Sequence, residues 1–237
     1  MKRRPFQRFV LLTEVGLLLT IIGAPLWLSR QRQYGLDRQL IAALKKYDTR
    51  QAMLLLDKGA DPNAPCTPLP APTLQDLRDY IVYRYIVPDE ARLTPSAFMM
   101  ACGAFGDGEN FRVWQRHSND PRYDTPQLVQ AMLKHGAKIN GDKFGLTPLQ
   151  WAASCGHLKT VRVLLDHSAD INGQNWMGQT PLSLGVEAKA SAATLRLLLE
   201  RGADPNLPRR GPTPLQLAQK NRRPDLVALL RRAGAER

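Results

Sequence analysis

One tripeptide, repeated three times, decides the fold: Thr147-Pro148-Leu149, Thr180-Pro181-Leu182 and Thr213-Pro214-Leu215. Successive copies begin 33 residues apart. Each copy opens one apolar helical stretch, and a second stretch follows that ends in paired leucines before a short turn. A fixed period of this length is typical of proteins built from stacked supersecondary units. The sequence therefore predicts a solenoid of helix–turn–helix repeats.

The residue types of the repeat have local physical reasons. Proline suits the first turn of a helix, where its missing N–H would have no partner, and a threonine before it can cap the helix. Glycine after the second helix permits a left-handed backbone at the helix end. Small residues such as Ala152 and Ala153 let neighbouring helices approach closely.

These residues resemble the ankyrin repeat, which opens on a Thr-Pro-Leu-His-x-Ala pattern at this period. The Gly-His that ankyrin repeats carry between helices matches Gly156-His157, and their closing sequence matches Gly202-Ala203-Asp204-Pro205-Asn206. The ankyrin histidine is replaced by Gln150, Ser183 and Gln216, which puts one local hydrogen bond in question. The resemblance implies an all-α solenoid whose β-turn fingertips precede each Thr-Pro-Leu.

Two degenerate copies precede the three clear ones. The first has a predicted helix at about Arg38–Lys46 and lacks Thr-Pro-Leu, as expected of a terminal repeat. The second begins at Thr94-Pro95 and is lengthened by an insertion. The predicted ankyrin-repeat domain covers residues 36–237, with copies at about 38–63, 94–140, 147–172, 180–206 and 213–237, and insertions at about 64–89 and 103–125.

The N-terminus predicts a membrane segment. Residues 9–28 form an apolar run whose only charge is Glu14, and they follow a basic flank at residues 1–8. Twenty residues of helix are long enough to cross the hydrocarbon core, so we expect a single transmembrane helix or signal anchor. A cleaved secretory signal is the main alternative, and a soluble apolar helix is the third. The basic residues favour, by a thin margin, an exported C-terminal domain.

The net charge of +12 is concentrated at the two ends of the chain. The N-terminal excess flanks the apolar segment, and the C-terminal excess lies in the last repeat. No aromatic residues that could stack on bases are interleaved with the C-terminal cluster, so nucleic acid is not an expected partner. The basic end either keeps the terminal repeat soluble or meets acidic proteins or anionic lipid headgroups. Its candidate residues are Arg222, Arg223, Arg231 and Arg232.

The fingertips form the second candidate binding surface. They place large apolar side chains where the repeat pattern predicts exposure, and such side chains are enriched at the centres of protein interfaces. The competing interpretation is that these side chains fold back on neighbouring turns or on the second insertion. The candidate residues are Lys143, Phe144, Leu146, Trp176, Met177, Gln179, Arg209 and Arg210.

No catalytic, metal or cofactor site emerges from the sequence. There is no CxxC or HExxH pattern, and the insertions bring no converging nucleophile, base and oxyanion donors. Cys102 and Cys155 occupy equivalent places in adjacent repeats and are expected to be free thiols, whereas Cys66 could reach Cys102 in an exported domain. The sequence thus predicts a monomeric, membrane-anchored, non-enzymatic module for binding proteins, with a structural tether as the alternative.

Overall fold

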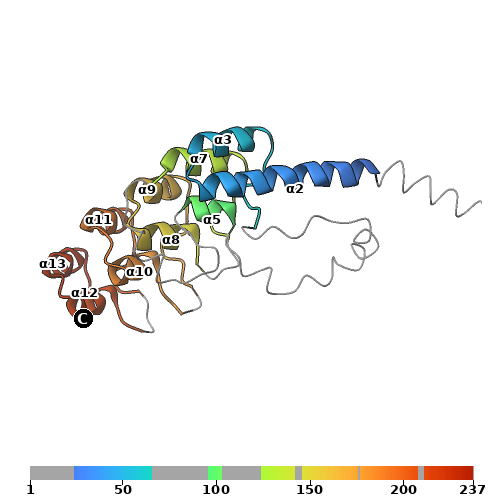
Figure 1. Ribbon diagram of the computed structural model, residues 1–237. Coiled ribbons are helices and arrows are strands. Elements are labelled where there is room, and N and C mark those ends of the chain that lie inside the picture. The colour runs from blue at the N-terminus through green and yellow to red at the C-terminus, as the bar shows by residue number, and fades with distance from the viewer. Residues whose placement is uncertain are drawn as a thin grey trace, which may run out of the picture.

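The computed structural model describes residues 24–65, 96–102, 124–141, 146–175, 177–207 and 211–236. Within these ranges the chain forms five antiparallel helix pairs (Figure 1). The pairs are α2 (Ala24–Lys45) with α3 (Thr49–Asp57), α5 (Ala97–Ala101) with α7 (Pro126–Lys134), α8 (Pro148–Cys155) with α9 (Leu158–Asp166), α10 (Pro181–Glu187) with α11 (Ala192–Glu200), and α12 (Pro214–Lys220) with α13 (Pro224–Arg232).

The helices stack in two layers. The first helices of the pairs (α2, α5, α8, α10, α12) form one row and the second helices (α3, α7, α9, α11, α13) form the other, and each helix contacts its neighbour along the row (Figure 1). The core runs between the rows and includes the fully buried Leu149, Leu164, Leu182 and Leu198. In the described residues the only β pairing is an isolated bridge between Pro65 and Ser96, so the predicted all-α solenoid is confirmed.

The threonines and prolines act as the sequence predicts. Thr147, Thr180 and Thr213 each stand at the N-cap in extended conformation, and each hydroxyl accepts a hydrogen bond from the backbone N–H three residues later. The residue at that third position reciprocates by accepting from the threonine N–H, which completes a capping box. The three copies therefore begin their helices with the same local device.

The turn between the two helices of a pair needs one residue in left-handed conformation. Gly156 occupies it with φ 71°. At the corresponding place three other pairs have Tyr47, Lys189 and Arg222, with φ of 57°, 60° and 55°. Side chains with a Cβ pay for this conformation in steric energy, so these turns are locally less favourable than the one at Gly156.

A ladder of side chains joins each closing turn to the next. Asn63 donates through Nδ2 to the Gly136 carbonyl at 3.0 Å and accepts from the Lys138 N–H at 2.9 Å. Asn172 and Asn206 make the same pair of bonds to the turns that follow them, and Asn140 accepts from the Asp170 N–H. The asparagine of the closing sequence thus fixes the spacing of the repeats.

The first helix is longer than predicted. α2 begins at Ala24 rather than near Arg38, because no proline or second glycine interrupts the chain from Leu26 to Lys45. Nothing in the described ranges is a helix of sufficient length and apolarity to traverse a bilayer. Most of the predicted membrane segment, residues 9–23, lies outside those ranges, as does the basic flank at residues 1–8.

The described residues on either side of positions 66–95 lie next to each other. Pro65 pairs with Ser96, and the Ala97 N–H donates to the Ala64 carbonyl at 2.8 Å. Ser96 caps α5, since its hydroxyl accepts from the Met99 N–H. Most of both predicted insertions lies outside the described residues, so the division into copies and insertions stays a prediction.

Candidate protein-binding surface

The best-defined fingertip is a hairpin whose described residues are 175 and 177–179. The Asn175 N–H donates to the Gln179 carbonyl at 3.0 Å, and the Gly178 N–H donates back to the Asn175 carbonyl at 2.8 Å. The Asn175 side chain braces the turn from within, because its Oδ1 accepts from the N–H groups of Met177 and Gln179 at 3.0 and 2.8 Å. The hairpin therefore holds its shape through its own hydrogen bonds.

Gln150 fastens this hairpin to the preceding repeat. Its amide nitrogen donates to the carbonyls of Gly173 and Gln179 at 2.9 and 3.1 Å, while its oxygen accepts from the Thr147 N–H at 2.8 Å. The side chain is fully buried, so these bonds satisfy groups that water does not reach. The glutamine that replaces the ankyrin histidine thus makes a local hydrogen bond, with the Thr147 N–H, and adds two bonds to the fingertip that follows.

The described fingertip candidates have different surroundings. Met177 is 53% exposed. Gln179 is partly buried and donates to Glu187 Oε2 at 2.7 Å. Leu146 is partly buried and packs against the small cluster of Met99, Trp151 and Cys155. Met177 is therefore the one of these three that presents an apolar side chain to solvent.

The other fingertip candidates lie outside the described residues. They are Lys143, Phe144, Trp176, Arg209 and Arg210.

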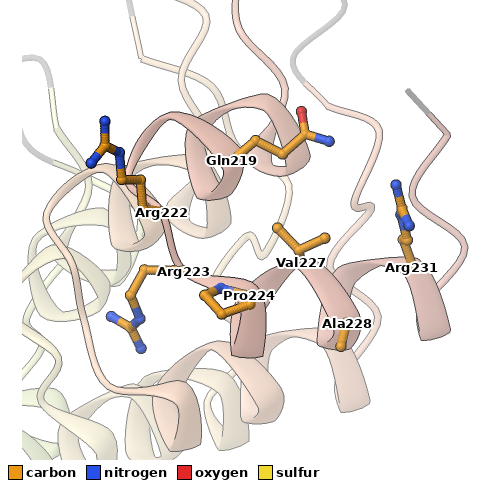
Figure 2. A pocket seen from close by; sticks show the side chains of 7 residues that line it. All are labelled: Gln219, Arg222, Arg223, Pro224, Val227, Ala228 and Arg231. Carbon is orange, nitrogen blue, oxygen red and sulfur yellow. The ribbon is translucent and has the colours of Figure 1, made fainter.

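The basic end forms a groove on the last helix pair. Arg222, Arg223 and Arg231 line it, together with Gln219 of α12 and Pro224, Val227 and Ala228 of α13 (Figure 2). Arg232 is exposed on α13 but does not line the groove. The groove thus combines three of the four predicted arginines with an apolar floor.

One of these arginines is already paired. Arg223 donates from Nε and Nη2 to the two carboxylate oxygens of Asp225, at 2.9 and 2.7 Å. This contact holds the pKa of the Asp225 carboxyl below its usual range. Neither Arg222 nor Arg231 has a side-chain hydrogen bond or ion pair in the part of the chain that the structure describes, so both guanidinium groups can receive an acceptor.

The two described cysteines are buried free thiols. Burial, with a smaller contribution from the nearby Cys155, raises the pKa of the Cys102 thiol well above its ordinary value. A thiol in this environment stays protonated and is a poor nucleophile. Cys66 lies outside the described residues. In those residues no group of three or more His, Cys, Asp or Glu side chains is arranged to hold a metal ion.

Three residues that hold this architecture together were not identified from the sequence. Asp124, assigned to the second insertion, accepts from the N–H groups of Lys159 and Thr160 and so caps α9 from the neighbouring repeat. Gln33 and Asp37, placed before or at the edge of the first repeat, bond to the closing turn of that repeat. One feature indicates that α9 needs a cap from elsewhere: its own N-cap residue, His157, makes no side-chain capping bond.

Comparison with known proteins agrees with this geometry. A family model described as ankyrin repeats, in three copies, matches residues 122–209. Among similar proteins is "Ankyrin repeat, SAM and basic leucine zipper domain-containing protein 1" of Carollia perspicillata, 41% identical over 107 residues, which cover 43% of this chain and 22% of that protein. The protein of the same description from Dasypus novemcinctus is 38% identical over 115 residues, covering 46% and 24%. The chain thus carries ankyrin repeats and spans less than a quarter of the length of these two relatives.

Proposed function

We propose that this chain, which carries ankyrin repeats, is a non-enzymatic module that binds another protein through its fingertips. The observation that carries the proposal is the hairpin at residues 175–179, which is braced internally and presents Met177 to solvent. A surface that is ordered before it meets a partner loses little conformational entropy on binding. Methionine adapts its flexible side chain to an apolar partner.

The packing behind the hairpin supports the same role. Gln150 ties the hairpin to the first helix of the preceding repeat, and the asparagine ladder fixes that repeat against its neighbours. A fingertip held in this way transmits the rigidity of the solenoid to the contact surface. Ankyrin repeats are generally interaction modules, and fold alone does not name the partner.

Site-specific photo-crosslinking in the native cell tests the proposal. A photoreactive phenylalanine analogue is placed at Met177, and at Leu54 as the matched control, because Leu54 is a large side chain exposed to a similar degree (44% against 53%) on α3. We expect a discrete crosslinked protein from position 177 and none from position 54. Equal crosslinking from both positions, or none from either, contradicts fingertip binding.

The groove favours a second candidate function, a structural tether. In this alternative the basic C-terminal repeat holds an acidic protein or anionic headgroups, and the fingertips serve only to pack the repeats. Substitutions distinguish the tether from fingertip binding. If the tether is correct, substitution of the groove arginines abolishes partner binding, while Met177→Ala combined with Phe144→Ala leaves it unchanged.

Membrane anchoring through residues 9–28, with an exported repeat domain, is proposed on the sequence alone. Its support is the length and apolarity of that segment. We expect the chain to remain in the membrane fraction after alkaline carbonate extraction, and a reporter fused after Arg237 to show activity outside the cytoplasm. Release of the intact chain by carbonate contradicts the anchor, and a reporter active only in the cytoplasm reverses the orientation.

A further inference from the structure

The groove on the last repeat lies on a face that, in the earlier repeats, packs against the next repeat, and no described residue packs on it. The second helices are each nine residues long, which allows their positions to be compared directly. The fourth residue is at most 1% exposed in the four earlier helices, where it is Ala52, Val129, Val161 or Leu195. In α13 it is Val227, which is only half-buried and forms part of the groove floor.

Two other positions on this face are apolar in earlier repeats and polar in the last one. The eighth residue of the second helix is Leu56, Leu133, Leu165 or Leu199 in the earlier pairs and Arg231 in the last. The sixth residue of the first helix is Ala153 in α8 and Val186 in α10, both fully buried, and is the exposed Gln219 in α12. The last repeat thus keeps an apolar floor but surrounds it with cationic and polar side chains.

The charges lie on both sides of the floor. Figure 2 shows Arg222 and Arg223 toward one end of the groove and Arg231 toward the other, with Val227 between them. Arginine forms paired hydrogen bonds with carboxylates through its planar guanidinium, which makes it suited to recognising acidic side chains. Because Arg223 is already paired with Asp225, the arginines that can bind an acidic ligand are Arg222 and Arg231.

We propose that this groove binds an extended acidic segment of a partner protein, with one small apolar side chain of the segment resting on Val227. Pro224 and Arg231 lie seven residues apart on α13, about 10 Å along its axis. Five residues in extended conformation cover about 13 Å, so acidic residues at both ends of such a segment reach both sets of arginines. This inference rests on the second candidate function, the tether, and names the partner class and the mode of contact at its C-terminal groove.

Stacking of a second copy of this chain does not fit the groove. The opposite end of the solenoid presents Arg30, Arg32 and Arg38 as exposed side chains of α2. Head-to-tail association would therefore join two ends of the solenoid that both carry exposed arginines. Like charges brought together at an interface oppose association.

Peptide binding to the purified full chain in a non-ionic detergent tests the inference. The probe is a fluorescently labelled, end-blocked pentapeptide, Glu-Glu-Val-Glu-Glu, read by fluorescence anisotropy. Two peptides serve as controls, one with glutamines in place of the glutamates and one with glycine in place of the valine. We expect the acidic peptide with valine to bind most tightly and the glutamine peptide not to bind.

The protein variants separate the groove from general charge. Arg222→Gly with Arg231→Gln removes the two free receptors, and Arg222→Gly leaves the left-handed turn in a conformation that glycine favours. Lys220→Gln with Arg232→Gln removes two exposed charges of the same repeat that do not line the groove. We expect the first pair to weaken the Kd by about tenfold and the second by about twofold or less.

Three outcomes overturn the inference. They are equal weakening by the two double variants, equal binding of the valine and glycine peptides, and tighter binding of glycerophosphoserine, a soluble lipid headgroup analogue, than of the acidic peptide. None of these outcomes changes the crosslinking result at Met177, so failure of the acidic-segment inference is distinguishable from failure of fingertip binding.

Discussion

The two ends of the solenoid complete the same stacking pattern in different ways. In the interior, the asparagine of one closing turn bonds to the next turn. In the described residues no closing turn precedes that of the first pair, and α2 supplies both partners from its own side chains: Gln33 Nε2 donates to the Gly59 carbonyl at 2.9 Å, and Asp37 Oδ1 accepts from the Asp61 N–H at 2.7 Å. These are the two bonds that Asn172 makes to Gly202 and Asp204.

The C-terminal end shows no comparable closure in the described residues. Asn206 completes the last rung with Gly234 and Glu236, but the floor at Val227 stays half-buried. At the N-terminal end, side chains of α2 supply the hydrogen bonds that a preceding repeat would otherwise make. At the C-terminal end, polar side chains surround a half-buried apolar floor that stays accessible. An accessible end is where a partner can add contacts without displacing any.

The largest predicted effect is on unfolding free energy, when the same valine-to-alanine substitution is made in the interior and at the C-terminal end. Val161→Ala removes two methyl groups from a fully buried position, and we expect it to cost about 2 kcal/mol of unfolding free energy. Val227→Ala makes the same change at the equivalent position of α13 and should cost less than about 1 kcal/mol. Urea unfolding followed by circular dichroism measures both. Equal costs would mean that Val227 is as well packed as the interior and that its face is closed.

The N-terminal closure can be broken by one side chain. Asp37→Ala removes the acceptor for the Asp61 N–H and should cost about 1 kcal/mol, because the exposed turn lets water replace part of the bond. Asp37→Asn keeps an oxygen in place and is the matched control, with an expected change below about 0.5 kcal/mol at neutral pH. Thermal or urea unfolding compares the two. Equal losses from both would show that the charge, and not the acceptor, closes the ladder.

The repeat architecture was predictable because its determinants are local. The capping threonine and the proline in the first turn lie next to each other and recur in all three copies, at Thr147, Thr180 and Thr213. A glycine with positive φ ends the second helix in two of these copies, at Gly202 and Gly234, and Ser168 takes that conformation in the third. The structure accordingly matches the expected helices from α8 onward. The long α2 was missed because the sequence pattern of the first copy begins only near residue 38.

The binding surface was less predictable because its determinants are distant in sequence. Gln150 joins a helix to a hairpin about 30 residues away, and Asp124 caps a helix more than 30 residues later. The burial of Leu146 against Met99 and Trp151 likewise depends on which repeats become neighbours. That Arg222, Arg223 and Arg231 share a groove follows from the position of α13 at the end of the stack.

A smaller effect should sharpen the contrast at the C-terminal turn. Arg222→Gly relieves a left-handed conformation that a Cβ disfavours, at the cost of a more flexible unfolded chain, so we expect a gain of about 0.5 to 1 kcal/mol. Gly156→Ala introduces the same strain at the equivalent turn of the third pair and should lose about 1 kcal/mol. Urea midpoints at equal m-values measure both. Destabilisation by Arg222→Gly would indicate that the arginine side chain makes stabilising contacts in the free protein.

The smallest predicted effect is a pH dependence confined to the N-terminal end. Burial raises the pKa of the Asp37 carboxyl, and the bonds from Asp61 and Gln33 only partly offset it. The folded chain then binds this proton more tightly than the unfolded chain, so the contribution of Asp37 is most favourable below about pH 4, the ordinary range of an aspartate pKa, and is lost as the pH rises through the folded value. The free energy of unfolding of the wild type should therefore fall relative to that of Asp37→Asn across that interval. Above it, the two free energies should change with pH in parallel. A gap that instead widened in favour of the wild type with rising pH would mean that the hydrogen bonds outweigh burial, and that the closure depends on the ionised carboxylate.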